Sequence, residues 1–301
     1  MKPYKLLLII SFMLFSVGNT FAQNNDMKAR IEFEDAETAF QNKEYEKVIT
    51  YLTNAEKLLG KWTAKISFLK IQALDVITNY SDWNDNTAEL YRQVKEYMKY
   101  ADKNRDKVDL DRMREIYKIE KKIDFSKKKK DFEADADYKA GKDAYDKKNY
   151  ETAMNHFLKA AQKNNTTAMD AISDMYRDGI GVSVDYSKSI EWDTKASNLG
   201  DPISTSDIGV MYANGNGVKM DYKKALEYLQ IGAEYEIDYT MYHIGIIYHI
   251  GGNGVTQNYT EAMNWYKKAA DKGYPSAMYN IGHMYYEGQG VTQNYTEAMN
   301  W

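Results

Sequence analysis

The sequence GVTQNYTEAMNW occurs twice in this chain, at Gly254–Trp265 and again, letter for letter, at Gly290–Trp301. Two looser copies precede this pair, GVSVDYSKSIEW from Gly181 and GVKMDYKKALEY from Gly217, so the pattern recurs at spacings of 36, 37 and 36 residues. A period between about 20 and 50 residues is typical of proteins that stack one supersecondary unit many times. The sequence therefore predicts an array of repeats, each of which hides its apolar stripe against the next one.

The first half of each repeat is predicted to form a helix that ends in a glycine turn. Apolar and small residues lie there at helical spacing, as in Met278, Ile281 and Gly282. A Gly-x-Gly sequence stops the helix, because glycine readily takes the left-handed conformation of a helix C-terminus. A series of small residues and a series of tyrosines recur in register: Ser173, Gly209, Gly245 and Gly282, and Tyr176, Tyr212, Tyr248 and Tyr285. We predict that these tyrosines are core residues.

The second half of each repeat is predicted to form another helix. It begins at a side chain that accepts hydrogen bonds from free helix N–H groups, namely Asp185, Asp221, Asn258 or Asn294. Glu261 and Glu297 follow three residues after the last two of these, which predicts a capping box. Pro202 and Pro275 mark the start of the next first helix, where a missing N–H costs nothing. A second tyrosine series is also predicted to be core: Tyr186, Tyr222, Tyr259 and Tyr295.

These residues resemble the Sel1-like repeat family. Its pattern of a small residue and Tyr, Gly-x-Gly-Val, Asp-Tyr, Ala, Trp-Tyr, Ala-Ala and Gly is matched between Ile244 and Gly273, and the resemblance covers about 166–301. Two repeats depart from it, with Ser173 in place of the first-helix Gly and Glu236 in place of the closing Gly. The resemblance implies an all-α fold, a right-handed α-solenoid of helix-turn-helix repeats in which tetratricopeptide-like units precede Sel1-like repeats. It also implies protein–protein interaction, often in envelope or signalling assemblies.

Upstream of the Sel1-like repeats the chain is predicted to be helical. Residues 131–165 are similar to a tetratricopeptide unit, on the spacing of Gly141, Ala153, Phe157 and Ala160. An N-terminal helical region is expected at 23–130. Within it, a similar unit at 29–60 is indicated by the offsets of Ala36, Val48, Leu52 and Ala55. At the other end, the last repeat stops at Trp301 before its second helix is complete, so we expect an incomplete coding sequence.

Residues 1–22 have the layout of a secretory signal peptide. Lys2 and Lys5 precede an apolar run from Leu6 to Val17, and small residues follow up to Ala22. A run of a dozen apolar residues is too short to span a hydrocarbon core about 30 Å thick. We therefore expect cleavage after Ala22, no membrane-spanning segment in the mature chain, and export to the periplasm or the exterior of a bacterium.

Composition excludes several classes of function. The chain has 40 basic residues against 44 acidic ones and a net charge of −4, which argues against nucleic acid as a partner because that needs a basic face. It has no cysteine, so it has neither a disulfide framework nor thiolate chemistry. Its four histidines, His156, His243, His249 and His283, form no metal-ligating motif. We expect no catalytic residue, no cofactor and no metal.

The candidate binding surface follows from the repeat register. If the first helices line a concave groove, as in tetratricopeptide arrays, the positions three before, one after and four after the small residue face that groove. These positions carry Tyr138, Lys142, Tyr145, Asp170, Asp174, Arg177, Tyr242, His249, Tyr279, His283 and Tyr286. Aromatic and titratable side chains suit the capture of a peptide or a cell-wall fragment. The alternative, that they are ordinary surface residues of amphipathic helices, stays open.

The sequence thus predicts a non-enzymatic scaffold or adaptor of the bacterial cell envelope that binds a protein or peptide in its groove. One alternative is enzymatic. Cysteine-rich members of the family are associated with binding or hydrolysing β-lactams, and with peptidoglycan-related compounds, but paired cysteines pin their repeats and this chain has none. A second alternative is a purely structural spacer.

Overall fold

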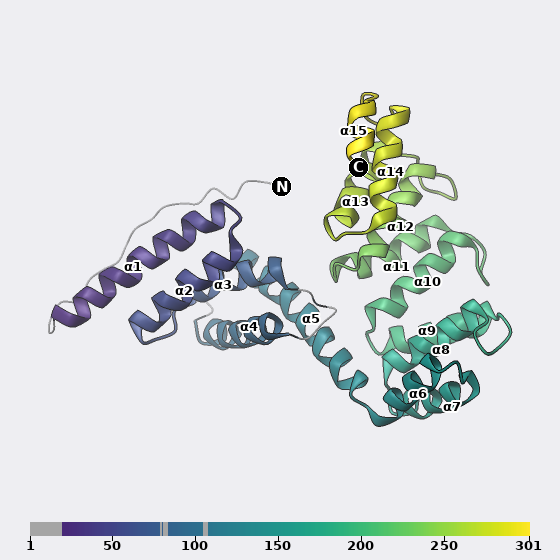
Figure 1. The fold of residues 1–301 in the computed structure, drawn as a ribbon, viewed down its shortest axis with the longest axis horizontal. Helices are drawn as coiled ribbons and strands as arrows, with labels where there is room; N and C mark the ends of the chain where they lie inside the picture. Colours follow the sequence, from purple (N-terminus) through teal and green to yellow (C-terminus); the bar gives the residue numbers. More distant parts are fainter. Residues whose placement is uncertain (1–19, 79, 81–83, 105–107) are drawn as a thin grey trace. The chain divides into compact units, whose positions relative to one another are not determined.

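The structure, a computed structural model, describes residues 20–78, 80, 84–104 and 108–301. Most of the predicted signal peptide lies outside these residues. The described residues form fifteen helices and a single isolated bridge between Gly252 and Val255, which confirms the all-α class (Figure 1). The chain divides into two compact units, residues 1–79 with 84–119 and residues 80–83 with 120–301.

The first unit contains four helices and the start of a fifth. These are α1 (Thr20–Gln41), α2 (Tyr45–Leu59), α3 (Ala64–Ile77), α4 (Asp85–Lys103) and the beginning of α5 (Leu110–Glu133). Successive helices from α1 to α4 pack against one another. The apolar residues that the sequence placed in register, Ala36, Val48, Leu52 and Ala55, are all completely buried between α1 and α2.

The second unit contains the end of α5 and ten further helices. These are α6 (Ala136–Asp146), α7 (Tyr150–Ala161), α8 (Thr166–Asp178), α9 (Tyr186–Asn198), α10 (Pro202–Asn214), α11 (Tyr222–Glu234), α12 (Asp238–Ile250), α13 (Tyr259–Asp271), α14 (Pro275–Glu287) and α15 (Tyr295–Asn300). They form five pairs, and the second helix of each pair packs on the first helix of the next (Figure 1). The unit is therefore a helical repeat solenoid, as predicted.

Each second helix begins at the predicted capping residue. The side chains of Asp185, Asp221, Asn258 and Asn294 accept hydrogen bonds from the backbone N–H three residues on. The predicted capping box, however, is wrong. A capping-box glutamate accepts from the N–H of the cap, but that N–H donates instead to the carbonyl of the first-helix tyrosine, as Asn258 does to Tyr248 at 2.7 Å. This bond recurs in four repeats and ties the two helices of a pair together.

The two helices of a pair cross where the small residue of the first helix faces a large residue of the second. A Cβ added to Gly245 would lie 2.5 Å from the ring of Tyr266, and one added to Gly141 would lie 2.6 Å from the ring of Phe157. Leu229 faces Gly209 in the same way. We call the second-helix residue the crossing position; in register it is Phe157, Asp193, Leu229 and Tyr266. The large residues Phe157, Leu229 and Tyr266 form the centres of three of these repeats.

The two tyrosine series lie around these centres and seldom inside them. Of the eight tyrosines, Tyr222 is buried, Tyr295 is 57% exposed and the other six are partly buried. The prediction that all eight are core residues was therefore too strong. The phenolic oxygen explains the position, because a tyrosine ring can pack on one side while its hydroxyl stays close to water. Among the helices of the described residues, none is both long and apolar enough to cross a membrane.

Candidate functional site: an acidic pocket on the first helices

The first helices of three successive repeats line one open pocket of about 610 Å³. Its lining is Asp170, Asp174, Arg177, Asp178, Tyr186, Ile203, Asp207, Val210, Met211, Asn214, Asn216, Tyr239, His243 and Tyr274. Most of these residues belong to α8, α10 and α12, the helices that the sequence predicts to face a groove. Three of the predicted groove residues, Asp170, Asp174 and Arg177, lie in this pocket.

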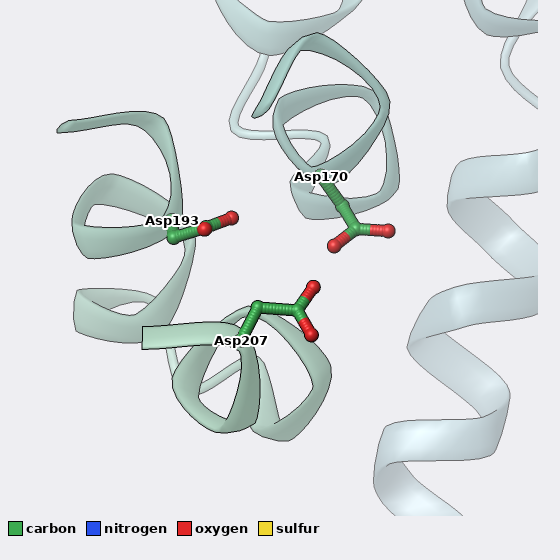
Figure 2. Close-up of side chains that lie close together, drawn as sticks. All are labelled: Asp170, Asp193 and Asp207. Carbon is green, nitrogen blue, oxygen red and sulfur yellow. The ribbon is translucent and has the colours of Figure 1, made fainter. Parts of the chain in front are cut away.

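A cluster of three aspartates lies at the wall of the pocket. Asp170 comes from α8, Asp193 from α9 and Asp207 from α10, and one carboxylate oxygen of each lies within 4.8 Å of the other two. Figure 2 shows the three carboxylates pointing into the space between these helices. Asp193 is completely buried, and neither of its carboxylate oxygens accepts a hydrogen bond. We call Asp170, Asp193 and Asp207 the aspartate cluster.

On the side that faces the pocket, Asp207 is the member of the aspartate cluster that contacts a tyrosine and an arginine. Tyr239 Oη donates to Asp207 Oδ1 at 2.8 Å, and Arg177 Nη1 lies 3.7 Å from Asp207 Oδ2. The same guanidinium pairs with Asp174 at 2.6 Å and with Asp178 at 3.0 Å. Arg177 is therefore shared among three carboxylates, and its charge does not neutralise the aspartate cluster.

Burial dominates the electrostatics of the cluster. Removal from water and, to a smaller extent, the charge of Asp207 raise the pKa of the Asp193 carboxyl to about 8, although the Ser173 hydroxyl opposes this shift. Burial also raises the pKa of Asp207 to about 6, although the bond from Tyr239 opposes this shift, and it raises the pKa of Asp170. A buried carboxylate is costly unless it holds a proton or faces a cation. Chemically, these residues can share protons or ligate a positive ion.

Of the three upstream groove candidates, Tyr138 shares a hollow with a residue of the aspartate cluster. Tyr138 packs against Phe157 with ring centroids 5.7 Å apart, and it lines a smaller hollow of about 190 Å³ together with Asp170. Tyr145 packs edge-on against Tyr150, and Lys142 is exposed, with its ammonium 3.5 Å from Asp146. Of these three residues, Tyr138 alone lines either hollow.

The downstream candidates divide into packed and exposed residues. Tyr242 packs against Tyr266 and Tyr274, and His249 packs against Tyr259 and Tyr266, so both are partly buried between helices. Along α14, Tyr279 and Tyr286 are 71% and 54% exposed, and His283 stacks on Tyr279.

Eleven of the fourteen residues that line the pocket were not among the groove candidates, and two of these eleven come from α12. These two are Tyr239 and His243, on the α12 face next to the predicted one. Burial lowers the pKa of His243 to about 4. Both were missed because the groove prediction sampled only three positions of each first helix.

Comparison with known proteins decides the family. The sequence pattern of the Sel1 repeat matches residues 135–165, 166–201, 203–234, 239–274 and 275–301, which is more than half of the chain. The chain belongs to the Sel1 repeat family. The first of these matches falls on the segment that we described as tetratricopeptide-like, so the Sel1 repeats begin one unit earlier than the resemblance at 166–301 indicated.

Solved Sel1 repeat structures are similar to parts of this chain. A Sel1 repeat protein from Oxalobacter formigenes is 28% identical over 54% of this chain and 67% of its own, with a TM-score of 0.46. The protein c5321, a protective antigen present in uropathogenic Escherichia coli strains, is 19% identical over 95% of this chain and 63% of its own, with a TM-score of 0.48. This chain thus spans about two thirds of the length of either protein. No curated protein matches it.

The Sel1 repeat at 166–201 differs from its neighbours in a way that explains the aspartate cluster. Its crossing position holds Asp193, where the other repeats have Phe157, Leu229 and Tyr266. Two serines, Ser173 and Ser189, also replace the glycine or alanine of the other repeats, and their hydroxyls lie 2.8 Å apart. An acid at an apolar core position was a signal in the sequence. It was missed because the groove prediction considered the first helices alone, and Asp193 lies on a second helix.

Proposed function

We propose that this protein is a non-enzymatic scaffold of the bacterial cell envelope that holds a segment of a partner protein in the pocket of α8, α10 and α12. Sel1 repeats typically mediate protein interactions, which supports the general role. The observation that carries the finer proposal is the pocket itself, because three successive first helices contribute to one open hollow.

The lining of the pocket indicates the chemistry of the bound segment. Asp174 and Asp178 each expose close to half of their side chains, at 40% and 46%. Tyr239, Tyr274 and His243 form an aromatic part of the same lining. Carboxylates beside aromatic rings favour a lysine or arginine side chain, which gains charge-assisted hydrogen bonds and cation–π contact. We therefore propose a peptide segment with at least one basic residue.

Affinity capture with two charge-matched variants tests this proposal. The bait is the chain from residue 23, incubated with an envelope extract and analysed by quantitative mass spectrometry. In the pocket variant, Asp174→Lys and Asp178→Lys reverse two carboxylates of the lining. In the control variant, Glu191→Lys and Glu227→Lys make the same charge change on the exposed faces of α9 and α11.

The expected result is that the wild-type and control chains recover the same partner and that the pocket variant loses it. A peptide from that partner should then cross-link to α8, α10 or α12. Recovery of the same proteins by all three chains would show that the pocket is not the binding surface. If the control variant also lost the partner, binding would depend on the total charge of the repeat array and would not require this pocket.

A further inference from the structure

Asp193 is the strongest sign of an unrecognised ligand in the second unit. Its side chain is completely buried, neither of its oxygens accepts a well-formed hydrogen bond, and its carboxylate points towards Asp170 and Asp207 (Figure 2). The nearby Ser173 hydroxyl lowers the pKa of Asp193 but does not reverse the effect of burial. Native proteins satisfy the great majority of their buried polar atoms, so a fully buried carboxylate with two free oxygens calls for a partner. Among the described residues, no lysine or arginine forms an ion pair with Asp193 or Asp170.

The spacing of the three carboxylates fits a single ion. Oxygens bound to Ca²⁺ lie about 2.3 to 2.6 Å from it, so two ligand oxygens of one ion are at most about 5 Å apart. One oxygen from each aspartate lies within 4.8 Å of the others, which is compatible with one Ca²⁺ ion. Mg²⁺ holds its oxygens at about 2.0 to 2.1 Å, so it would require the three carboxylates to lie within about 4 Å of one another.

We propose that Asp170, Asp193 and Asp207 bind one hard divalent cation, Ca²⁺ or Mg²⁺, at the wall of the pocket. The three side chains supply only oxygen ligands, and such sets favour Ca²⁺, Mg²⁺ or Mn²⁺ over the softer zinc and copper ions. A divalent ion removes most of the repulsion among the three carboxylates. Arg177 does not remove it, because its charge is shared among Asp174, Asp178 and Asp207.

Access to the site is asymmetric. Asp170 and Asp207 line the open pocket, whereas Asp193 lies behind them in the centre of its repeat. An ion can therefore enter from the pocket, and water can complete its shell on that side. Tyr239 donates its hydroxyl hydrogen to Oδ1 of Asp207, which orients the carboxylate. The other oxygen, Oδ2, lies 3.7 Å from Arg177 Nη1, beyond hydrogen-bond distance, so its lone pairs remain available to an ion.

The repeat register is independent support for a built site. At the crossing position the other repeats bury Phe157, Leu229 or Tyr266, so Asp193 gives up an apolar contact that the fold makes elsewhere. The loss of such a contact destabilises a packed core. A cation bound by Asp193 offsets this loss with interactions that an apolar side chain cannot make.

Terbium luminescence on the chain from residue 23, freed of metal with EDTA, tests the proposal. Tb³⁺ is an oxygen-seeking ion that emits when a nearby tyrosine is excited, and Tyr239 bonds directly to Asp207. We expect emission that saturates at one ion per chain and that millimolar Ca²⁺ or Mg²⁺ displaces. The ion that displaces Tb³⁺ at the lower concentration identifies the preferred cation. The same ion should raise the melting temperature of the metal-free protein.

Two substitutions and one control make the test specific. Asp193→Asn and, separately, Asp170→Asn should weaken Tb³⁺ binding by about 10-fold or more, because each removes a direct ligand charge. Both remove repulsion without changing shape, so the variants should stay folded, as circular dichroism will show. Glu227→Gln removes a carboxylate from the exposed face of α11, outside the cluster and the pocket, and should leave Tb³⁺ binding unchanged.

Two results would overturn the proposal. The first is a folded wild-type chain that gives neither sensitised emission nor a rise in melting temperature with any of the three ions. The second is equal Tb³⁺ affinity in the wild type, Asp193→Asn and Asp170→Asn, which would place the ion elsewhere. This proposal does not rest on the scaffold function, since no partner is present in the experiment. Partner capture in EDTA then tests the scaffold separately.

Discussion

Lys122 on α5 and Glu236, two residues after the 203–234 repeat, form an ion pair, with 2.9 Å between Nζ and Oε1. Lys272, one repeat further on, binds the other oxygen of the same carboxylate. Glu236 stands where the neighbouring repeats have Gly200 and Gly273, and like them it has a positive φ, of 60°. The departure from the family pattern at this position therefore connects α5 to the repeat array.

We expect Glu236→Gln to destabilise the second unit by about 1 to 2 kcal/mol. The substitution removes the negative charge of a partly buried side chain, so the ammonium groups of Lys122 and Lys272 lose their ion-pair partner. Burial opposes ionisation of Glu236, but Lys122 and Lys272 hold its pKa below the ordinary value. This contribution is present at neutral pH and is lost as pH falls through that lowered pKa. Urea unfolding at pH 7 and at low pH measures it. An equal loss in the variant at both pH values would contradict an ionic origin.

We expect Gly245→Ala to destabilise the protein by about 1 to 3 kcal/mol, because the new methyl group would overlap the ring of Tyr266. A glycine-to-alanine change inside a helix otherwise stabilises by roughly 0.5 to 1 kcal/mol, so the sign of the effect is diagnostic. Thermal unfolding measures it, with Lys267→Ala on the exposed face of α13 as the control. A rise in melting temperature would show that the two helices can separate at this crossing.

We expect the free energy of unfolding to decrease as the pH is lowered from 6.5 to 4, in part because of His243. Its folded-state pKa is lowered to about 4, so the unfolded chain binds a proton in this window that the folded chain does not. The stabilisation is complete above the unfolded pKa and decreases as pH falls, by about 3 kcal/mol in total. His243→Asn should flatten the pH dependence of urea unfolding, and His283→Asn, at an exposed ring on α14, should not. Identical profiles for wild type and His243→Asn would refute the assignment.

We expect Lys70→Met to destabilise the first unit by about 3 to 5 kcal/mol, since it leaves two carboxylates without their buried partner. The Lys70 side chain is only 4% exposed, and its ammonium lies 3.1 Å from Glu56 and 3.0 Å from Glu89. Hydrogen exchange of the α3 and α4 amides reports on this unit alone, and exposed Lys57→Met serves as the control. Unchanged protection in Lys70→Met would mean that the three charges contribute little.

We expect bacterial expression of the whole chain to yield a periplasmic or secreted protein whose first residue is Gln23. The reason is the layout of residues 1–22, with Lys2 and Lys5 ahead of an apolar run and small residues up to Ala22. Cell fractionation and N-terminal sequencing test this. Recovery of a chain that still begins with Met1 in the cytoplasmic fraction would contradict export.

Much of the repeat architecture could be predicted from local chemistry. The identical copies at Gly254–Trp265 and Gly290–Trp301 set the period, and glycine turns and Asp or Asn caps set the ends of the helices. These features depend on residues within one or two turns of each other, so the sequence alone contains the information. The capping-box prediction failed because it depends on a more distant contact. The backbone N–H of Asn258 donates to the carbonyl of Tyr248, ten residues earlier in the chain and on the other helix of the pair.

The aspartate cluster was decided by tertiary structure. Asp170, Asp193 and Asp207 span 37 residues, and only the crossing of α8, α9 and α10 brings their oxygens within 4.8 Å. Which carboxylates leave water depends on the faces that three helices turn towards each other, and periodicity within one helix does not specify that. The sequence determined by itself that helices pair and stack. The packing of neighbouring pairs decided where charge is buried, because burial is a property of several helices together.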